Sequence, residues 1–213
     1  MHPSWLELCC ELEIAPSEDE TVTLAELAWP KLERAYATPL RAYHSLQHVE
    51  QTLFALDELM PRGQTRWLAE FALWFHDAIY IAGRTDNESL SAAMFQQVTQ
   101  SWPLSASQRS CVHDAILATR HIGVPTDEVG QFVADADLAI LAADAARYTN
   151  YVAAIRQEFA AFDDVAFSRG RETFLRAMLR RERLFHTPRA FAIWEARARE
   201  NLAAELARLI AKP

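Results

Sequence analysis

The sequence predicts an all-helical fold of about nine helices in a single domain. Glycine is scarce, at five of 213 residues, prolines fall mostly between periodic segments, and no useful stretch alternates like a β-strand. Hydrophobic residues make up 51% and charged residues 23%, as in a globular domain with a substantial core. No linker is long enough to separate a second domain, so we expect residues 1–213 to fold as one unit.

Four helices are expected in the first part of the chain. The first two span residues 3–13 and 21–37, and the third follows a Ser45 cap and runs to about Leu59. The fourth spans residues 65–80. Its apolar stripe at helical spacing consists of Leu68, Phe71, Ala72, Phe75 and Ile79.

The remaining segments continue the helical pattern. The helix expected over 86–100 has polar and acidic residues in its first turn, and the helix over 105–120 is stopped by a following glycine and proline. The next, over 127–142, can be capped by Thr126 or Asp127. The last three helices are expected over 145–162, 165–183 and 188–211, the final two as a docked pair.

Composition and charge exclude several classes of protein. The net charge of -8 makes nucleic acid and acidic membrane surfaces unlikely partners. No run of roughly 18 apolar residues is present, so no membrane span is expected. Residues 1–13 carry three glutamates and lack the basic stretch typical of a secretory signal. The chain has three cysteines, which lack metal-ligand spacing and suit a reducing compartment. We therefore expect a cytoplasmic protein, and the sequence leaves homo-oligomerisation open.

Arginine is concentrated near the C-terminus. Residues 168–200 contain nine arginines against four glutamates, a local charge of +5. One interpretation is a solvated helix face with intrahelical ion pairs. The other is that some of these arginines reach an anionic ligand.

Histidines and aspartates in three segments form a candidate metal site. His44 and His48 are four residues apart, without the glutamate of an HExxH motif. His76 and Asp77 follow a very apolar segment and are expected inside its helix, where a buried carboxylate needs a partner or a metal. A hydrogen-bonded His–Asp pair would explain that segment equally well. Neutral imidazole is the commonest metal ligand, so His48 and His76 are the candidate nitrogen ligands.

The third segment contains Asp135 and Asp137. A stripe of apolar residues at about 100° per residue passes next to Asp137, while Asp135 lies on its other side. We therefore expect Asp137 to be the buried ligand and Asp135 to be a cap or a supporting residue. With His48, His76 and Asp77 this gives a mixed nitrogen and oxygen site for a divalent ion such as Mn, Mg, Co, Ni, Fe or Zn.

The ordered pattern His, His-Asp, Asp in an all-helical chain resembles the HD superfamily of metal-dependent phosphohydrolases. The similarity spans roughly residues 40–145, with the C-terminal helices packed onto this core. The segment Tyr43-His44-x-x-x-His48 is similar to the opening motif of cyclic-nucleotide phosphodiesterases in that superfamily. The resemblance implies that His44 protonates the leaving group and that His48 binds metal. The resemblance also selects Asp137, because Asp137 lies in an Ala-Asp-Leu sequence like that of the superfamily's closing motif. The motifs taken together are similar to those of bacterial predicted HD hydrolases of uncharacterised substrate.

The chain departs from the phosphodiesterases in its shorter length and its lack of a nucleotide-clamping glutamine context, so cyclic-nucleotide specificity does not follow. The expected activity is hydrolysis of a small phosphomonoester or phosphodiester, with a nucleotide-like compound as one candidate, by a metal-activated water. Asp77 would orient or deprotonate that water, and Glu88 is a candidate general base. The alternative for Glu88 is a first-turn glutamate favoured by the helix dipole.

Two rival functions remain open. An iron-dependent HD-type oxygenase would need His113 or His121 as additional ligands. A non-catalytic helical sensor would bind a metal or ligand without turnover. Arg84 and Arg120 are candidate phosphate contacts in the hydrolase interpretation.

Overall fold

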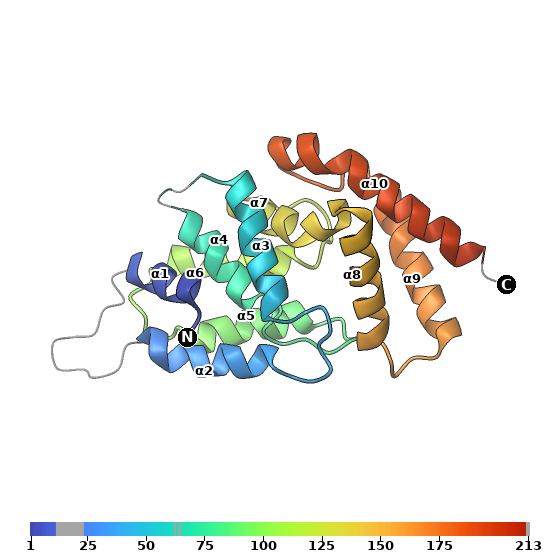
Figure 1. Cartoon of the computed structure of the whole chain (residues 1–213). Coiled ribbons are helices and arrows are strands. Elements are labelled where there is room, and N and C mark those ends of the chain that lie inside the picture. Colours follow the sequence, from blue (N-terminus) through green and yellow to red (C-terminus); the bar gives the residue numbers. More distant parts are fainter. Residues whose placement is uncertain (12–23, 62, 64, 212–213) are drawn as a thin grey trace.

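The computed structural model describes residues 1–11, 24–61, 63 and 65–211. Within them the chain forms ten α-helices, one 3₁₀ helix and no strand, so the all-α prediction is confirmed and the helix number is close to the expected one. In chain order the elements (Figure 1) are α1 (Pro3–Glu11), α2 (Leu24–Tyr36), α3 (Leu46–Leu59), α4 (Arg66–Phe75), α5 (Asn87–Val98), α6 (Ala106–Ala118), α7 (Glu128–Leu138), η1 (Ala139–Ala142), α8 (Ala145–Glu158), α9 (Asp164–Leu179) and α10 (Pro188–Ile210). The expected helical positions 12–13 and 21–23 lie outside the described residues.

Capping side chains explain where several helices begin. Ser105 forms a reciprocal capping box with Gln108 at the start of α6. Asp127 rather than Thr126 caps α7, through a 2.8 Å hydrogen bond from the backbone N–H of Gly130. Ser45 precedes α3 as expected, but its side chain makes no capping hydrogen bond. Local side-chain chemistry thus fixes the starts of α6 and α7.

The helix that carries the His76-Asp77 segment is shorter than the sequence predicts. Helix α4 ends at Phe75, with His76 as its C-cap and Asp77 in the following turn. Arg41 binds the turn that follows, since its guanidinium donates to the carbonyl oxygens of Asp77 (2.6 Å) and Ala78 (3.0 Å). The prediction that the pair lies inside the helix was therefore wrong.

Two hydrophobic clusters form the core. The first is built from residues of all helices from α1 through α7 and contains fully buried aromatic side chains such as Trp5, Phe71 and Trp74. Their rings meet edge to face, with Trp5 and Trp74 centroids 5.7 Å apart. The second joins η1 and α8–α10, and Phe132 and Trp194 pack against both clusters. Helix α10 contacts α9, as expected of a docked pair, and also η1.

The arginine-rich C-terminal region is stabilised by several different contacts. Arg171 is buried and makes a bidentate pair with Glu205, at 2.7 and 3.0 Å. Arg176 and Arg199 form i,i+4 pairs with glutamates on their own helices. Some of these arginines therefore stabilise helix packing, and others form ion pairs along a helix surface.

No helix in the described part of the chain has the length and apolarity needed to cross a membrane.

Candidate metal centre

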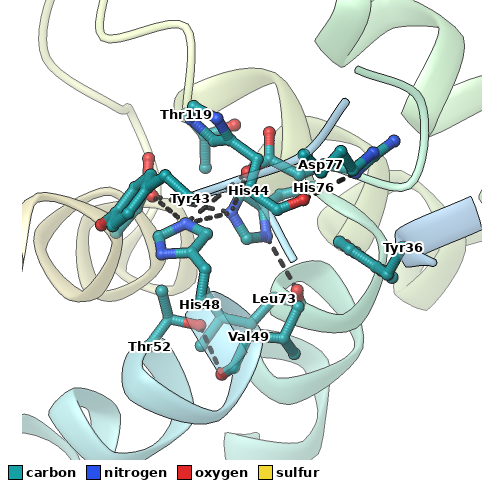
Figure 2. A network of polar contacts seen from close by, with 12 residues as sticks. Tyr36, Tyr43, His44, His48, Val49, Thr52, Leu73, His76, Asp77 and Thr119 are labelled. Atoms are coloured by element: carbon teal, nitrogen blue, oxygen red, sulfur yellow. Dashed lines mark hydrogen bonds and ion pairs between the residues drawn. The ribbon is translucent and has the colours of Figure 1, made fainter. Parts of the chain in front are cut away.

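Two imidazoles and one carboxylate from three helical segments meet at one point. His48 lies in the first turn of α3, His76 caps α4 and Asp137 lies in the last turn of α7. Nε2 of His48 is 3.2 Å from Nε2 of His76 and 3.1 Å from Oδ1 of Asp137. Figure 2 shows the two imidazoles turned toward each other. The three ligand atoms all lie within 4.8 Å of one another, so these residues could hold a metal ion.

Asp77 borders this group from the turn after α4. Its Oδ2 lies 3.0 Å from Nε2 of His76 and 3.5 Å from Nε2 of His48. The mutually close set consists of His48, His76 and Asp137 alone among the described residues. Asp77 is thus in contact with both imidazoles, and its role as a fourth ligand stays a prediction.

The hydrogen bond behind His76 prepares it to bind a metal. Nδ1 of His76 lies 2.7 Å from the carbonyl oxygen of Leu73. A carbonyl oxygen can only accept, so Nδ1 carries a hydrogen, and Nε2, which faces the carboxylates, is the nitrogen that would bind a metal after giving up its own proton. Nδ1 of His48 is buried and has no hydrogen-bond partner in the described part of the chain. The donor set fits a divalent cation with open coordination positions.

The local charges favour a cation between the imidazoles. Burial opposes the charged form of His76, but Asp77 and Asp137 outweigh it and raise the pKa of His76 well above its usual value. Burial lowers the pKa of His48. Burial would raise the pKa of Asp77, yet the neighbouring histidines, His76 first, hold it far below its usual value. The cluster therefore keeps anionic carboxylates facing a neutral His48, an arrangement suited to metal binding.

His44 lies beside the cluster and is held by a glutamate. Its ring centroid is 5.7 Å from that of His48, and the ring stacks on Tyr80 at 3.9 Å. Nδ1 of His44 lies 2.6 Å from Oε2 of Glu158, whose side chain is fully buried. The backbone N–H groups of Tyr43 and His44 donate to the other oxygen of Glu158, at 2.7 and 2.9 Å. Glu158 thus fixes both the ring and the backbone before α3.

Glu158 remains a carboxylate although it is buried. Burial would raise its pKa, but the hydrogen bonds from His44 and Tyr43 outweigh this and lower it. Glu158 was not among the residues expected at the site from the sequence. A signal was present, because Glu158 continues the buried stripe of Tyr148, Tyr151 and Ile155 at helical spacing.

His121 supports Asp137 from the other side. Nε2 of His121 lies 2.8 Å from Oδ2 of Asp137. His121 has a φ of 54°, a left-handed conformation that is uncommon for residues other than glycine. Arg181 donates a hydrogen bond to its backbone carbonyl group. A strained residue held by its neighbours against a candidate ligand indicates a positioning role.

The other predicted residues lie elsewhere. Asp135 is more buried than Asp137, contrary to expectation, and its carboxylate accepts the backbone N–H groups of His186 and Thr187 at the start of α10, each at 2.7 Å. Glu88 lies 3.8 Å from Arg120 in an ion pair, so its role as a base stays a prediction.

Two further candidates are also accounted for. His113 contacts Asp114 on the surface and does not belong to the metal-ligand group. Arg84 forms an exposed ion pair with Asp86. Neither contact brings a further ligand to the candidate metal centre.

A groove of about 430 Å³ opens along one side of the cluster. His48 and Asp137 line it, together with residues of α3, η1, α8 and α10. A second groove of about 290 Å³ adjoins it and shares Tyr43, His48, Gln51, Ile140 and Arg147. The candidate metal centre is therefore accessible to a small molecule.

No family model, curated protein or solved structure matches this chain. The resemblance to the HD superfamily thus rests on the residues quoted above and stays a prediction.

Proposed function

We propose that this protein is a metal-dependent hydrolase of small phosphate esters. The observation that carries the proposal is the convergence of His48, His76 and Asp137, whose ligand atoms lie within 4.8 Å of one another. His48 and Asp137 also line a groove. Asp77 is proposed as the fourth ligand because its Oδ2 contacts both imidazoles. A mixed nitrogen and oxygen set with open positions is typical of catalytic rather than structural metal sites.

A divalent cation held there would supply an activated water and would neutralise charge on the phosphoryl oxygens. In the overall reaction water oxygen bonds to phosphorus, the ester P–O bond breaks, and the leaving oxygen takes up a proton. His44 is the proposed proton donor. Because Nδ1 of His44 faces Glu158, Nε2 is the nitrogen available to the substrate. Asp77 is proposed to orient the water and accept its proton.

The supporting residues fit this division of roles. Glu158 fixes the orientation of His44, and His121 fixes that of Asp137. Arg41 holds the turn that carries Asp77 and also donates to the carbonyl oxygen of His44 at 3.0 Å. The donor and the ligands are therefore connected through part-buried hydrogen bonds, which favours a fixed geometry at the reacting centre.

The test combines metal analysis with hydrolysis of model esters. We expect the purified chain to bind a divalent ion and to release phosphate from 4-nitrophenyl phosphate or its bis-ester in the presence of Mn²⁺, Co²⁺, Ni²⁺ or Mg²⁺. His76→Ala should lose both properties. His113→Ala, which alters a surface histidine outside the cluster, should retain both.

Three results would refute the hydrolase proposal. Failure of the wild-type chain to bind divalent ions would remove the metal centre. Tight metal binding without hydrolysis of any ester would favour a sensor. Two irons per chain, with loss of the second in His121→Ala and no phosphate release, would favour the oxygenase.

A further inference from the structure

The groove over the metal centre is lined by arginines that the proposed hydrolysis does not use. Arg147 projects from α8, and Arg189 and Arg197 from α10. Arg189 and Arg197 are distant in sequence from the cluster, and Arg147 follows Asp137 by ten residues. Helices α8 and α10 both contact η1, and the three arginines line one groove. Figure 1 shows α8 and α10 in the same part of the molecule. This convergence is a property of the tertiary structure.

Two of these guanidinium groups are available to a ligand. The structure records no side-chain hydrogen bond or ion pair for Arg147 or Arg197 within the described residues, and both are exposed. Arg189 differs, because its Nε donates to the backbone carbonyl group of Glu58. Arg147 also lines the adjoining groove, so it lies where the two grooves join beside His48.

Three acidic residues line the same groove, and two of them are already engaged by other groups. Asp137 is a proposed metal ligand and is engaged by histidines. Asp144 accepts the backbone N–H groups of Ala146 and Arg147 as the N-cap of α8. Glu58 is the remaining acid. With a divalent cation bound at the cluster, the groove presents a positive centre at its floor and guanidinium groups along its wall.

We propose that this groove selects substrates carrying a second anionic group, which Arg147 and Arg197 bind while the reacting phosphate lies at the metal centre. Guanidinium groups recognise phosphate and carboxylate through paired charge-assisted hydrogen bonds. The inference rests on the proposed phosphoester hydrolysis for the placement of the first phosphate. It adds a specificity determinant and a substrate class, namely phosphoesters with two separated anionic groups.

The experiment compares ligands that differ by one phosphate. Calorimetry would measure dissociation constants of adenosine 5′-monophosphate and adenosine 3′,5′-bisphosphate, and of fructose 6-phosphate and fructose 1,6-bisphosphate. For at least one pair we expect the bisphosphate to bind about tenfold more tightly, since one charge-assisted hydrogen bond corresponds to roughly that factor. Arg147→Gln and Arg197→Gln should each remove most of this advantage, in the metal-loaded and the metal-free chain.

Arg208→Gln is the matched control, because Arg208 is an exposed arginine on the same helix as Arg197 and does not line the groove. Equal affinity within both ligand pairs, or an equal loss in the control variant, would overturn the inference. Hydrolysis is measured separately on the same samples. Arginine-dependent binding without hydrolysis would refute the proposed function alone, whereas hydrolysis with arginine-independent binding would refute only the second anion site.

Discussion

Replacing Glu158 tests how the structure holds His44. One oxygen of Glu158 accepts two backbone N–H groups, and the other accepts Nδ1–H of His44 at 2.6 Å. Glu158→Gln keeps one oxygen for the backbone but places an amide N–H₂ opposite a ring nitrogen that carries hydrogen. The ring must then change its tautomer or turn away.

The magnitudes follow from the number of hydrogen bonds lost. Glu158→Gln loses one charge-assisted hydrogen bond, so we expect the free energy of unfolding to fall by about 2 kcal/mol. Glu158→Ala leaves three part-buried donors without their acceptor, each worth about 1–3 kcal/mol, so we expect a loss of about 4 kcal/mol. The value lies near the low end of the summed range because the donors are part-buried, although the side chain of Glu158 is fully buried.

Chemical denaturation measures the stability loss, and nitrogen NMR of the His44 ring identifies which nitrogen is protonated. We also expect Glu158→Gln to lower metal-stimulated phosphate release by at least about tenfold, since a positioned general acid contributes about 10²–10⁴. Glu200→Gln, at an exposed position of α10, is the control. The reasoning would be refuted if Glu158→Ala unfolded within about 0.5 kcal/mol of the wild type, or if Glu158→Gln left the hydrogen on Nδ1.

Three further variants distinguish residues that stabilise the fold or position a metal ligand from residues that bind the metal. His121→Ala should weaken metal affinity about 10–100-fold in a metal titration, because Oδ2 of Asp137 then loses its hydrogen-bond partner. His113→Ala should leave metal affinity unchanged, and equal effects of the two variants would contradict the positioning role of His121. Asp135→Ala should destabilise the fold by about 2–4 kcal/mol in denaturation, through three hydrogen bonds lost at the start of α10, with metal affinity unchanged. Glu205→Ala should cost about 3–5 kcal/mol because it leaves the buried Arg171 without its carboxylate partner and the Tyr148 hydroxyl without its acceptor. The double variant Arg171→Met/Glu205→Leu should recover part of this loss, and an additive double variant would exclude the ion pair as a cause.

The sequence by itself determined the helical class and many helix starts. Apolar residues at helical spacing and the scarcity of glycine are local properties, and they survive folding because each helix buries its own stripe. Capping residues such as Ser105 and Asp127 act on the backbone within three residues, so their effect is visible without the fold. The sequence also singled out His48, His76 and Asp137, because histidines and aspartates next to apolar segments need partners.

The tertiary structure decided what each of these side chains meets. Asp135 and Asp137 are two residues apart, yet one is held at the start of α10 and the other faces the histidines. Helix α4 ends at Phe75, and Arg41 from a distant loop donates to the carbonyl oxygens of Asp77 and Ala78 in the turn that follows. Glu158 meets His44 across 114 positions of sequence. Such pairings depend on how helices pack, and helix packing is set by the shapes of many side chains together rather than by any local pattern.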